Sequence, residues 1–99
     1  IDVPLPADSP LLDSKRLIAS ATLNPIDLAD GAGETLSMTC IGAALGDFVL
    51  VSAPYDLQDL IVTGYVQSSD TVEIRVQNEN NGANVNLASG TWKVMVFKV

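Results

Sequence analysis

The sequence predicts an all-β fold, a small antiparallel β-sandwich or jelly-roll-like barrel with an extended N-terminal arm. Three observations predict it. From Leu17 onward, apolar runs recur roughly every 10–14 residues between turn residues, which is typical of sandwiches and barrels. Several runs alternate apolar and polar side chains, as strands with one buried face do. Three prolines in the first 16 residues prevent a helix there, because proline removes a donor and restricts its predecessor to extended geometry.

The chain divides into an arm, residues 1–16, and a β-sandwich domain, residues 17–99. At 99 residues, with 47% hydrophobic and 17% charged residues, it has room for one domain with a thin core. The arm carries apolar residues at intervals, and we expect them to bind another surface, although a frayed terminus is the simpler alternative. These residues are Ile1, Val3, Leu5, Leu11 and Leu12.

The first two strands are expected at residues 20–26 and 35–41. Pro25 restricts the first to a sheet edge or a strand end. Two glycines in residues 30–34 favour a hairpin turn rather than a calcium loop, because the regular acidic spacing of such loops is missing. In residues 35–41 the alternation places Leu36, Met38 and Cys40 on the buried side.

The next two strands are expected at residues 47–53 and 60–67. The first has no polar face, because Phe48 to Val51 are all apolar, so we expect a strand that is central or covered on both sides. Residues 54–59 form a connection too short for a stable helix. Gly64 inside the following strand predicts a bulge or a close approach of another backbone.

The last two strands are expected at residues 71–77 and 91–99. Residues 71–77 alternate cleanly after a tight turn, with Val72, Ile74 and Val76 expected to point inward. Residues 78–90 form a long polar loop rich in Asn and Gly. In the final strand Trp92 shares one face with Val94 and Val96, whereas Met95 and Phe97 lie on the other. Trp92 is expected in the core, with an exposed sugar-binding platform as the alternative.

The final strand therefore has two apolar faces, and only one can face the domain core. The other is covered either by a loop of the same chain or by another chain, and a chain this short has little of its own to cover it. We favour a subunit interface. The candidate contact residues are Phe48, Tyr65, Met95 and Phe97.

Composition excludes several classes of function. Twelve acidic against five basic residues give a net charge of −7, which disfavours nucleic acid and anionic membranes as partners. The chain has no histidine, the commonest general base and transition-metal ligand, so we expect no enzyme, catalytic residue, metal or cofactor. The carboxylate pairs Asp56 with Asp59 and Asp70 with Glu73 are expected to be solvated. The single cysteine, Cys40, cannot form an internal disulfide and is expected to be buried.

Three motifs resemble a β-domain common in virion proteins of tailed phages. They are GAALGD at residues 42–47 with the apolar run to Pro54, TVEIRVQN at residues 71–78, and ASGTW at residues 88–92. The resemblance covers about four-fifths of the chain, from residue 21 to residue 99, and leaves the arm unmatched.

The resemblance implies a capsid decoration (cement) protein, a small β-sandwich that binds the phage head as a homotrimer and stabilises the shell. Its partners would be itself and the major capsid protein, and its location the capsid exterior of the virion. No catalytic residues come with the family. The alternative is the globular head of a tail fibre or spike that binds a host surface glycan through Tyr55, Tyr65 and the loop at residues 78–86.

Overall fold

The computed structural model describes residues 16–79 and 82–98, and in these residues the chain is all-β and antiparallel, as the sequence predicts. Six longer strands and two strands of two residues each form within the described part, and no helix forms there. The predicted contact residues of the arm, Ile1, Val3, Leu5, Leu11 and Leu12, lie outside the described residues.

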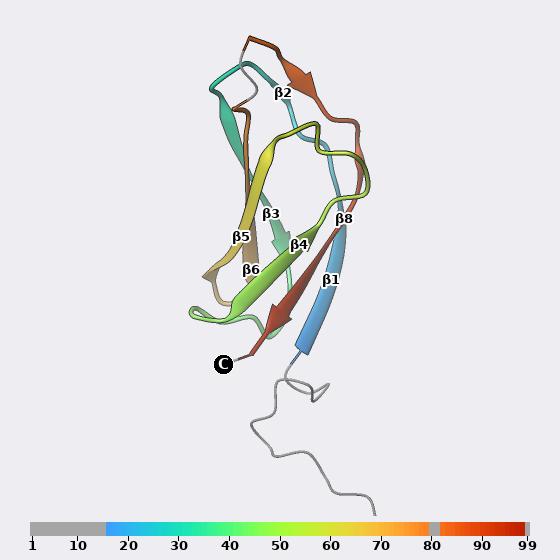
Figure 1. Cartoon of the computed structure of the whole chain (residues 1–99). Coiled ribbons are helices and arrows are strands. Elements are labelled where there is room, and N and C mark those ends of the chain that lie inside the picture. The colour runs from blue at the N-terminus through green and yellow to red at the C-terminus, as the bar shows by residue number, and fades with distance from the viewer. Residues whose placement is uncertain (1–15, 80–81, 99) are drawn as a thin grey trace, which may run out of the picture.

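Two three-stranded sheets form the body of the molecule (Figure 1). The first sheet consists of β1 (Arg16–Leu23), β8 (Gly90–Phe97) and β4 (Phe48–Ser52), in the order β1-β8-β4. Its middle strand, β8, pairs antiparallel with both neighbours. β4 is therefore an edge strand of this sheet.

The second sheet consists of β3 (Gly33–Thr39), β6 (Thr71–Gln77) and β5 (Ile61–Ser68), in the order β3-β6-β5. β5 and β6 form a hairpin whose turn includes Asp70 at a positive φ of 65°. The two sheets face each other as a sandwich, with β4 against β5 at one side and β1 against β3 at the other.

A third, short pair of strands lies at the upper end of Figure 1, where β2 (Asp27–Leu28) pairs with β7 (Val85–Asn86). The polar loop expected at residues 78–90 therefore contains a strand. Asn78, at its start, is fully buried, and its side-chain nitrogen donates to the carbonyl oxygens of Leu28 (2.8 Å) and Ala83 (3.0 Å). The buried amide thus ties the loop to β2.

The core lies between the two middle strands, because each buries one complete face. From β8 the inward residues are Trp92, Val94 and Val96, and from β6 they are Val72, Ile74 and Val76; all six are at most 1% exposed. Trp92 donates from Nε1 to the Tyr55 hydroxyl (3.1 Å), and that hydroxyl donates to the Ala88 carbonyl (2.6 Å). A sugar platform built on Trp92 is excluded by this burial.

The first strand begins and ends earlier than the sequence predicts. It pairs with β8 from Arg16 to Leu23, and Pro25 lies beyond its end rather than inside it. Proline has no N–H to donate to the ladder, so the chain leaves the first sheet before Pro25 and continues into β2.

The turn at residues 30–34 is also different from the expected hairpin. It is a tight turn, with Gly31 at a φ of 84° and a hydrogen bond from Ala32 N to Ala29 O (2.9 Å). The strands on its two sides do not pair with each other, since β2 pairs with β7 and β3 pairs with β6. The turn carries the chain from the short pair into the second sheet.

The prediction that residues 47–53 form a central or doubly covered strand is wrong for the single chain. β4 lies at the edge of its sheet, and only its inward residues, Val49 and Val51, contact the other sheet. They pack on Gly64 of β5, where an added Cβ would lie 2.5 Å from Val51 Cγ2. Side chains of β4, and not another backbone, come close to Gly64, and the irregularity of β5 falls later, between Val66 and Ser68.

Candidate interaction surface

The outer face of the first sheet carries two rows of apolar side chains. In the strand register, Ile18 of β1, Met95 of β8 and Leu50 of β4 stand side by side. The next row, toward the lower end of Figure 1, contains Phe97 of β8 and Phe48 of β4, with Arg16 of β1 beside them. We call Ile18, Phe48, Leu50, Met95 and Phe97 the apolar face.

These side chains are open to solvent in the single chain. Ile18 is 64% exposed, Phe48 69% and Leu50 60%, whereas Met95 and Phe97 are half-buried by their neighbours. Large apolar side chains scattered singly are normal on a protein surface, but a contiguous group on one sheet face is typical of an interface.

The apolar face ends at a polar row. Ser20, Lys93 and Ser52 stand side by side one step further along the three strands, and Thr22 pairs with Thr91 beyond them. A shallow hollow lies where the row of Ile18, Met95 and Leu50 meets this polar row. It is lined by Ile18, Leu50, Val51, Ser52, Lys93, Val94 and Met95.

A second exposed apolar group lies on the connection between β3 and β4, at the lower end of the molecule. Ile41 is 72% exposed and Leu45 is 71% exposed. We call these two residues the apolar tip. The connection runs directly into Phe48, the first residue of β4, so the tip adjoins the apolar face.

Hydrogen bonds hold the connection at residues 40–47 in one shape. Asp70 on the β5–β6 turn accepts from Cys40 N through its carbonyl (2.8 Å) and from Gly42 N through Oδ1 (2.8 Å), and it donates from its own N–H to Ala43 O (2.9 Å). Positive φ values at Gly42 (96°) and Gly46 (95°) allow the two tight turns.

Lys98 and Asp47 fix the other side of this connection. Lys98 Nζ lies 2.6 Å from Asp47 Oδ2 and also donates to the Gly42 carbonyl (2.8 Å), while Asp47 Oδ2 accepts from Ala44 N (3.0 Å). The Asp47 side chain is 5% exposed, so the carboxylate of this ion pair is shielded from solvent. These hydrogen bonds and this ion pair thus hold the connection that carries the apolar tip.

Cys40 is the first residue of the connection at residues 40–47 and is 2% exposed, as expected from the sequence. Burial raises the pKa of its thiol, and the neighbouring Asp70 carboxylate raises it further, against a lowering effect of Lys98. The thiol therefore stays protonated and unreactive in the folded chain at neutral pH.

The structure brings together three of the four candidate contact residues, Phe48, Met95 and Phe97. Tyr65 lies elsewhere, on the outer face of the second sheet opposite Glu73. Its hydroxyl donates to Glu73 Oε1 (2.5 Å), and this hydrogen bond raises the pKa of the Tyr65 phenol. Tyr55 also lies apart, with its hydroxyl bonded to Trp92 and Ala88.

Sequence reasoning missed Ile18, Leu50, Ile41 and Leu45 as surface residues. Ile18 was missed because the first strand was expected to begin at Ser20. The alternation of Ala19 to Thr22 is the signal that could have found it, since period two continued back along the strand places Ile18 on the side of Ser20 and Thr22. Nothing in the sequence distinguishes Leu45 in its turn from a buried leucine.

Several carboxylates have structural roles in turns. Asp56 Oδ1 accepts from Gln58 N (2.9 Å), Asp30 Oδ2 from Gly82 N (2.7 Å), and Glu34 Oε1 from Ile26 N (2.9 Å). Among residues 16–79 and 82–98, no group of three or more histidine, cysteine or acidic side chains could hold a metal ion. The same residues contain no helix that could cross a membrane.

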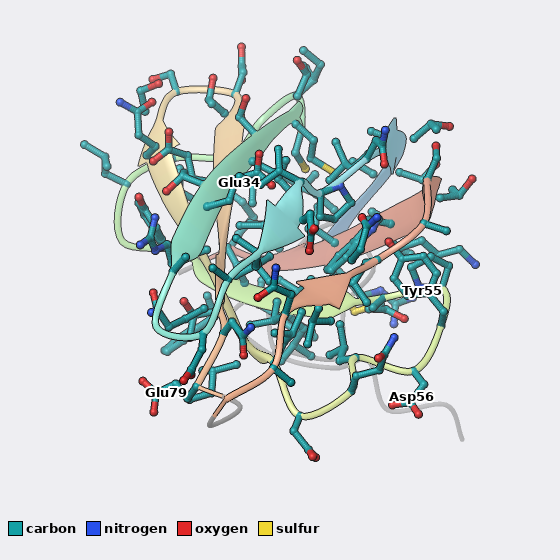
Figure 2. All side chains as sticks on the ribbon, turned by 90° about the horizontal axis from the view of Figure 1, so that it is seen from above. Glu34, Tyr55, Asp56 and Glu79 are labelled. Atoms are coloured by element: carbon teal, nitrogen blue, oxygen red, sulfur yellow. The ribbon has the colours of Figure 1, made fainter. Side chains whose placement is uncertain are left out.

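Acidic side chains gather at the end opposite the tip. Figure 2, the view from above onto the short β2–β7 pair, labels Glu34, Asp56 and Glu79. Asp27 and Asp30 belong to the same end through β2 and the turn that follows it. Most acidic side chains of the described part therefore lie at the upper end, beside the exposed Ile26 and Ile61, whereas the apolar face and the apolar tip lie at the lower end.

Comparisons of the chain with protein-family models, with curated proteins and with solved structures gave no match.

Proposed function

We propose that this chain is a viral structural protein, a capsid decoration protein that assembles as a homotrimer on the exterior of a phage head and stabilises the shell. The resemblance of its GAALGD, TVEIRVQN and ASGTW motifs to virion β-domains supports the class. The observation that carries the proposal is the apolar face of the first sheet, which one chain leaves open.

Burial of this face by neighbouring copies would stabilise the assembly. Fully burying a Leu, Ile or Phe side chain is worth about 1.5–3 kcal/mol relative to leaving it exposed. Ile18, Phe48 and Leu50 are each more than half exposed, so all three contribute. In an assembly with closed symmetry, every copy covers the apolar face of a neighbouring copy, so no apolar face stays open to solvent.

Residues 1–15 would supply the contact with the shell. They join the domain at Arg16, which stands beside Phe97 and Phe48 at the lower end of the first sheet. A segment of 15 residues spans up to about 50 Å when extended, enough to reach over neighbouring subunits. We propose that Ile1, Val3, Leu5, Leu11 and Leu12 insert into grooves of the major capsid protein.

Binding to shells tests this proposal. Capsid shells are assembled from the major capsid protein that the same genome encodes. They are mixed with the full chain or with a variant that lacks residues 1–15, and bound protein is measured by co-sedimentation. The full chain is expected to coat the shells. The shortened chain is expected to stay in solution with an unchanged oligomer mass, because the strands and the buried core of the domain lie within residues 16–97.

A control variant keeps the length and the prolines of the arm but replaces Ile1, Val3, Leu5, Leu11 and Leu12 by serine. It is expected to lose binding like the deletion, since apolar insertion carries the contact. Coating of shells by the shortened chain would refute the role of the arm. Failure of the full chain to bind any shell would refute the decoration function.

A further inference from the structure

We propose that copies of the chain associate head to tail, with the apolar tip of one copy, Ile41 and Leu45, seated in the hollow on the apolar face of the next copy. This inference rests on the self-association proposed above and names the two surfaces that meet. The occupant of the hollow is thus a second copy of this chain.

The symmetry of a ring requires two different surfaces on each copy. A two-fold dimer joins the same patch on both subunits, whereas a ring with an odd number of copies joins one patch to another, complementary patch. The chain offers such a pair at its lower end: a projecting tip of two exposed aliphatic side chains, and a hollow lined by Ile18, Leu50 and Met95.

The position of the two surfaces favours a closed ring over a filament. The tip lies at the end of the molecule and the hollow on the adjoining sheet face, and Phe48 stands between them. Head-to-tail contacts between opposite sides of a molecule continue in a line, but contacts between adjoining sides turn sharply at each copy. Successive turns of one sense close into a small ring.

The apolar face is too small for a stable contact by itself. The outer face of the first sheet has eleven outward residues on β1, β8 and β4, of which only five are apolar, whereas a standard interface uses roughly 20–30 residues a side. Because the tip adds a second contact surface to every copy, each copy buries both patches in a ring. Hydrogen bonds already hold the connection at residues 40–47 in one conformation, so less conformational entropy is lost when it enters the contact.

Charge also fits this arrangement. The acidic upper end is far from both surfaces, so neighbouring copies do not bring like charges together there. Lys93 lies at the polar end of the hollow, and Asp70 lies beside the tip with Oδ1 bonded to Gly42 N. A tip seated in the hollow brings these opposite charges toward each other, whereas two facing hollows bring two Lys93 side chains together.

Mixing two matched variants tests the inference. The tip variant is Ile41→Gln with Leu45→Gln, and the face variant is Leu50→Gln with Met95→Gln. Each leaves the net charge unchanged, and circular dichroism confirms that each stays folded. Both are expected to raise the concentration needed for assembly by about a hundredfold or more, as loss of two buried anchors does.

The mixture gives the decisive result, measured by native mass spectrometry with a mass tag on one variant. A tip variant keeps a working hollow and a face variant keeps a working tip, so a one-to-one mixture is expected to form dimers that contain one of each. The control, Thr22→Gln with Thr91→Gln, changes two exposed residues of the same sheet face that lie outside the hollow, and is expected to assemble like the wild type.

Three outcomes would overturn the inference. If the tip variant assembles like the wild type, the tip takes no part in the contact, and the apolar face pairs with itself while the proposed self-association stands. If the mixture contains no mixed dimers, the two surfaces do not meet. If the wild-type chain is itself a single subunit at every concentration, the self-association fails together with this inference.

Discussion

At the residue scale, Asn78 is the polar group on which the upper end of the molecule depends. Its side chain is fully buried and donates to carbonyl oxygens of two segments, Leu28 in β2 and Ala83 in the loop before β7. Its backbone also exchanges hydrogen bonds with the turn at residues 30–34, from Gly31 N to Asn78 O and from Asn78 N to Ala32 O (both 2.8 Å). One residue thus joins three segments.

Replacing Asn78 by alanine is expected to lower the free energy of unfolding by about 2 kcal/mol, because the buried Leu28 carbonyl oxygen and the partly buried Ala83 carbonyl oxygen lose their donor. Urea denaturation followed by circular dichroism measures the change. Asn84→Ala in the same loop is the control, since Asn84 is exposed, and it should change stability by less than about 0.5 kcal/mol. Equal stabilities of the two variants would show that the buried amide does not anchor the loop.

Asn78 also shows what sequence reasoning could not reach at this scale. The asparagine-rich loop predicts polar, left-handed turn geometry, and every asparagine in it looks alike in the sequence. Burial of one of them follows from the pairing of β2 with β7, which joins residues far apart in the chain. The alternating residues of β6 and β8, in contrast, were assigned to their buried faces from the sequence alone.

At the element scale, β4 differs most from its prediction. An apolar strand with no polar face indicates cover on both sides, but the sequence does not say whether the cover comes from the same chain. In the structure β4 is an edge strand, with Val49 and Val51 against β5 and with Phe48 and Leu50 in solvent. Cover on one face comes from β5, and no described part of the single chain covers the other face.

The junction between β4 and β5 depends on Gly64. An alanine there would place its Cβ 2.5 Å from Val51 Cγ2 and 3.0 Å from Val49 Cγ1, which forces the two strands apart. Gly64→Ala is expected to destabilise the domain by about 1–3 kcal/mol, as overpacking of a core does. Thermal unfolding measures the loss.

A double variant separates this clash from other effects of the substitution. Val51→Ala removes the methyl group that the new Cβ would meet, so Gly64→Ala should cost less in that background than in the wild type. The same cost in both backgrounds would show that the close approach of the two strands is not what requires glycine at this position.

At the scale of the whole molecule, the domain has two unlike ends. The upper end carries acidic side chains around the short β2–β7 pair (Figure 2), and the lower end carries the apolar face, the tip and the start of β1. Fourteen buried apolar residues of the described part form the core, six of them on the two middle strands, and the exposed apolar groups lie outside it. This division supports a molecule that binds at its lower end.

The mass of the assembly in solution tests the central claim, that copies of the chain cover one another's apolar face. Sedimentation equilibrium over a wide range of protein concentration measures it, with Leu50→Gln/Met95→Gln beside the wild type. We expect a wild-type mass three times that of one chain, and a variant that sediments as single chains at concentrations where the wild type is assembled. A folded wild type that keeps the mass of one chain at every concentration would contradict it.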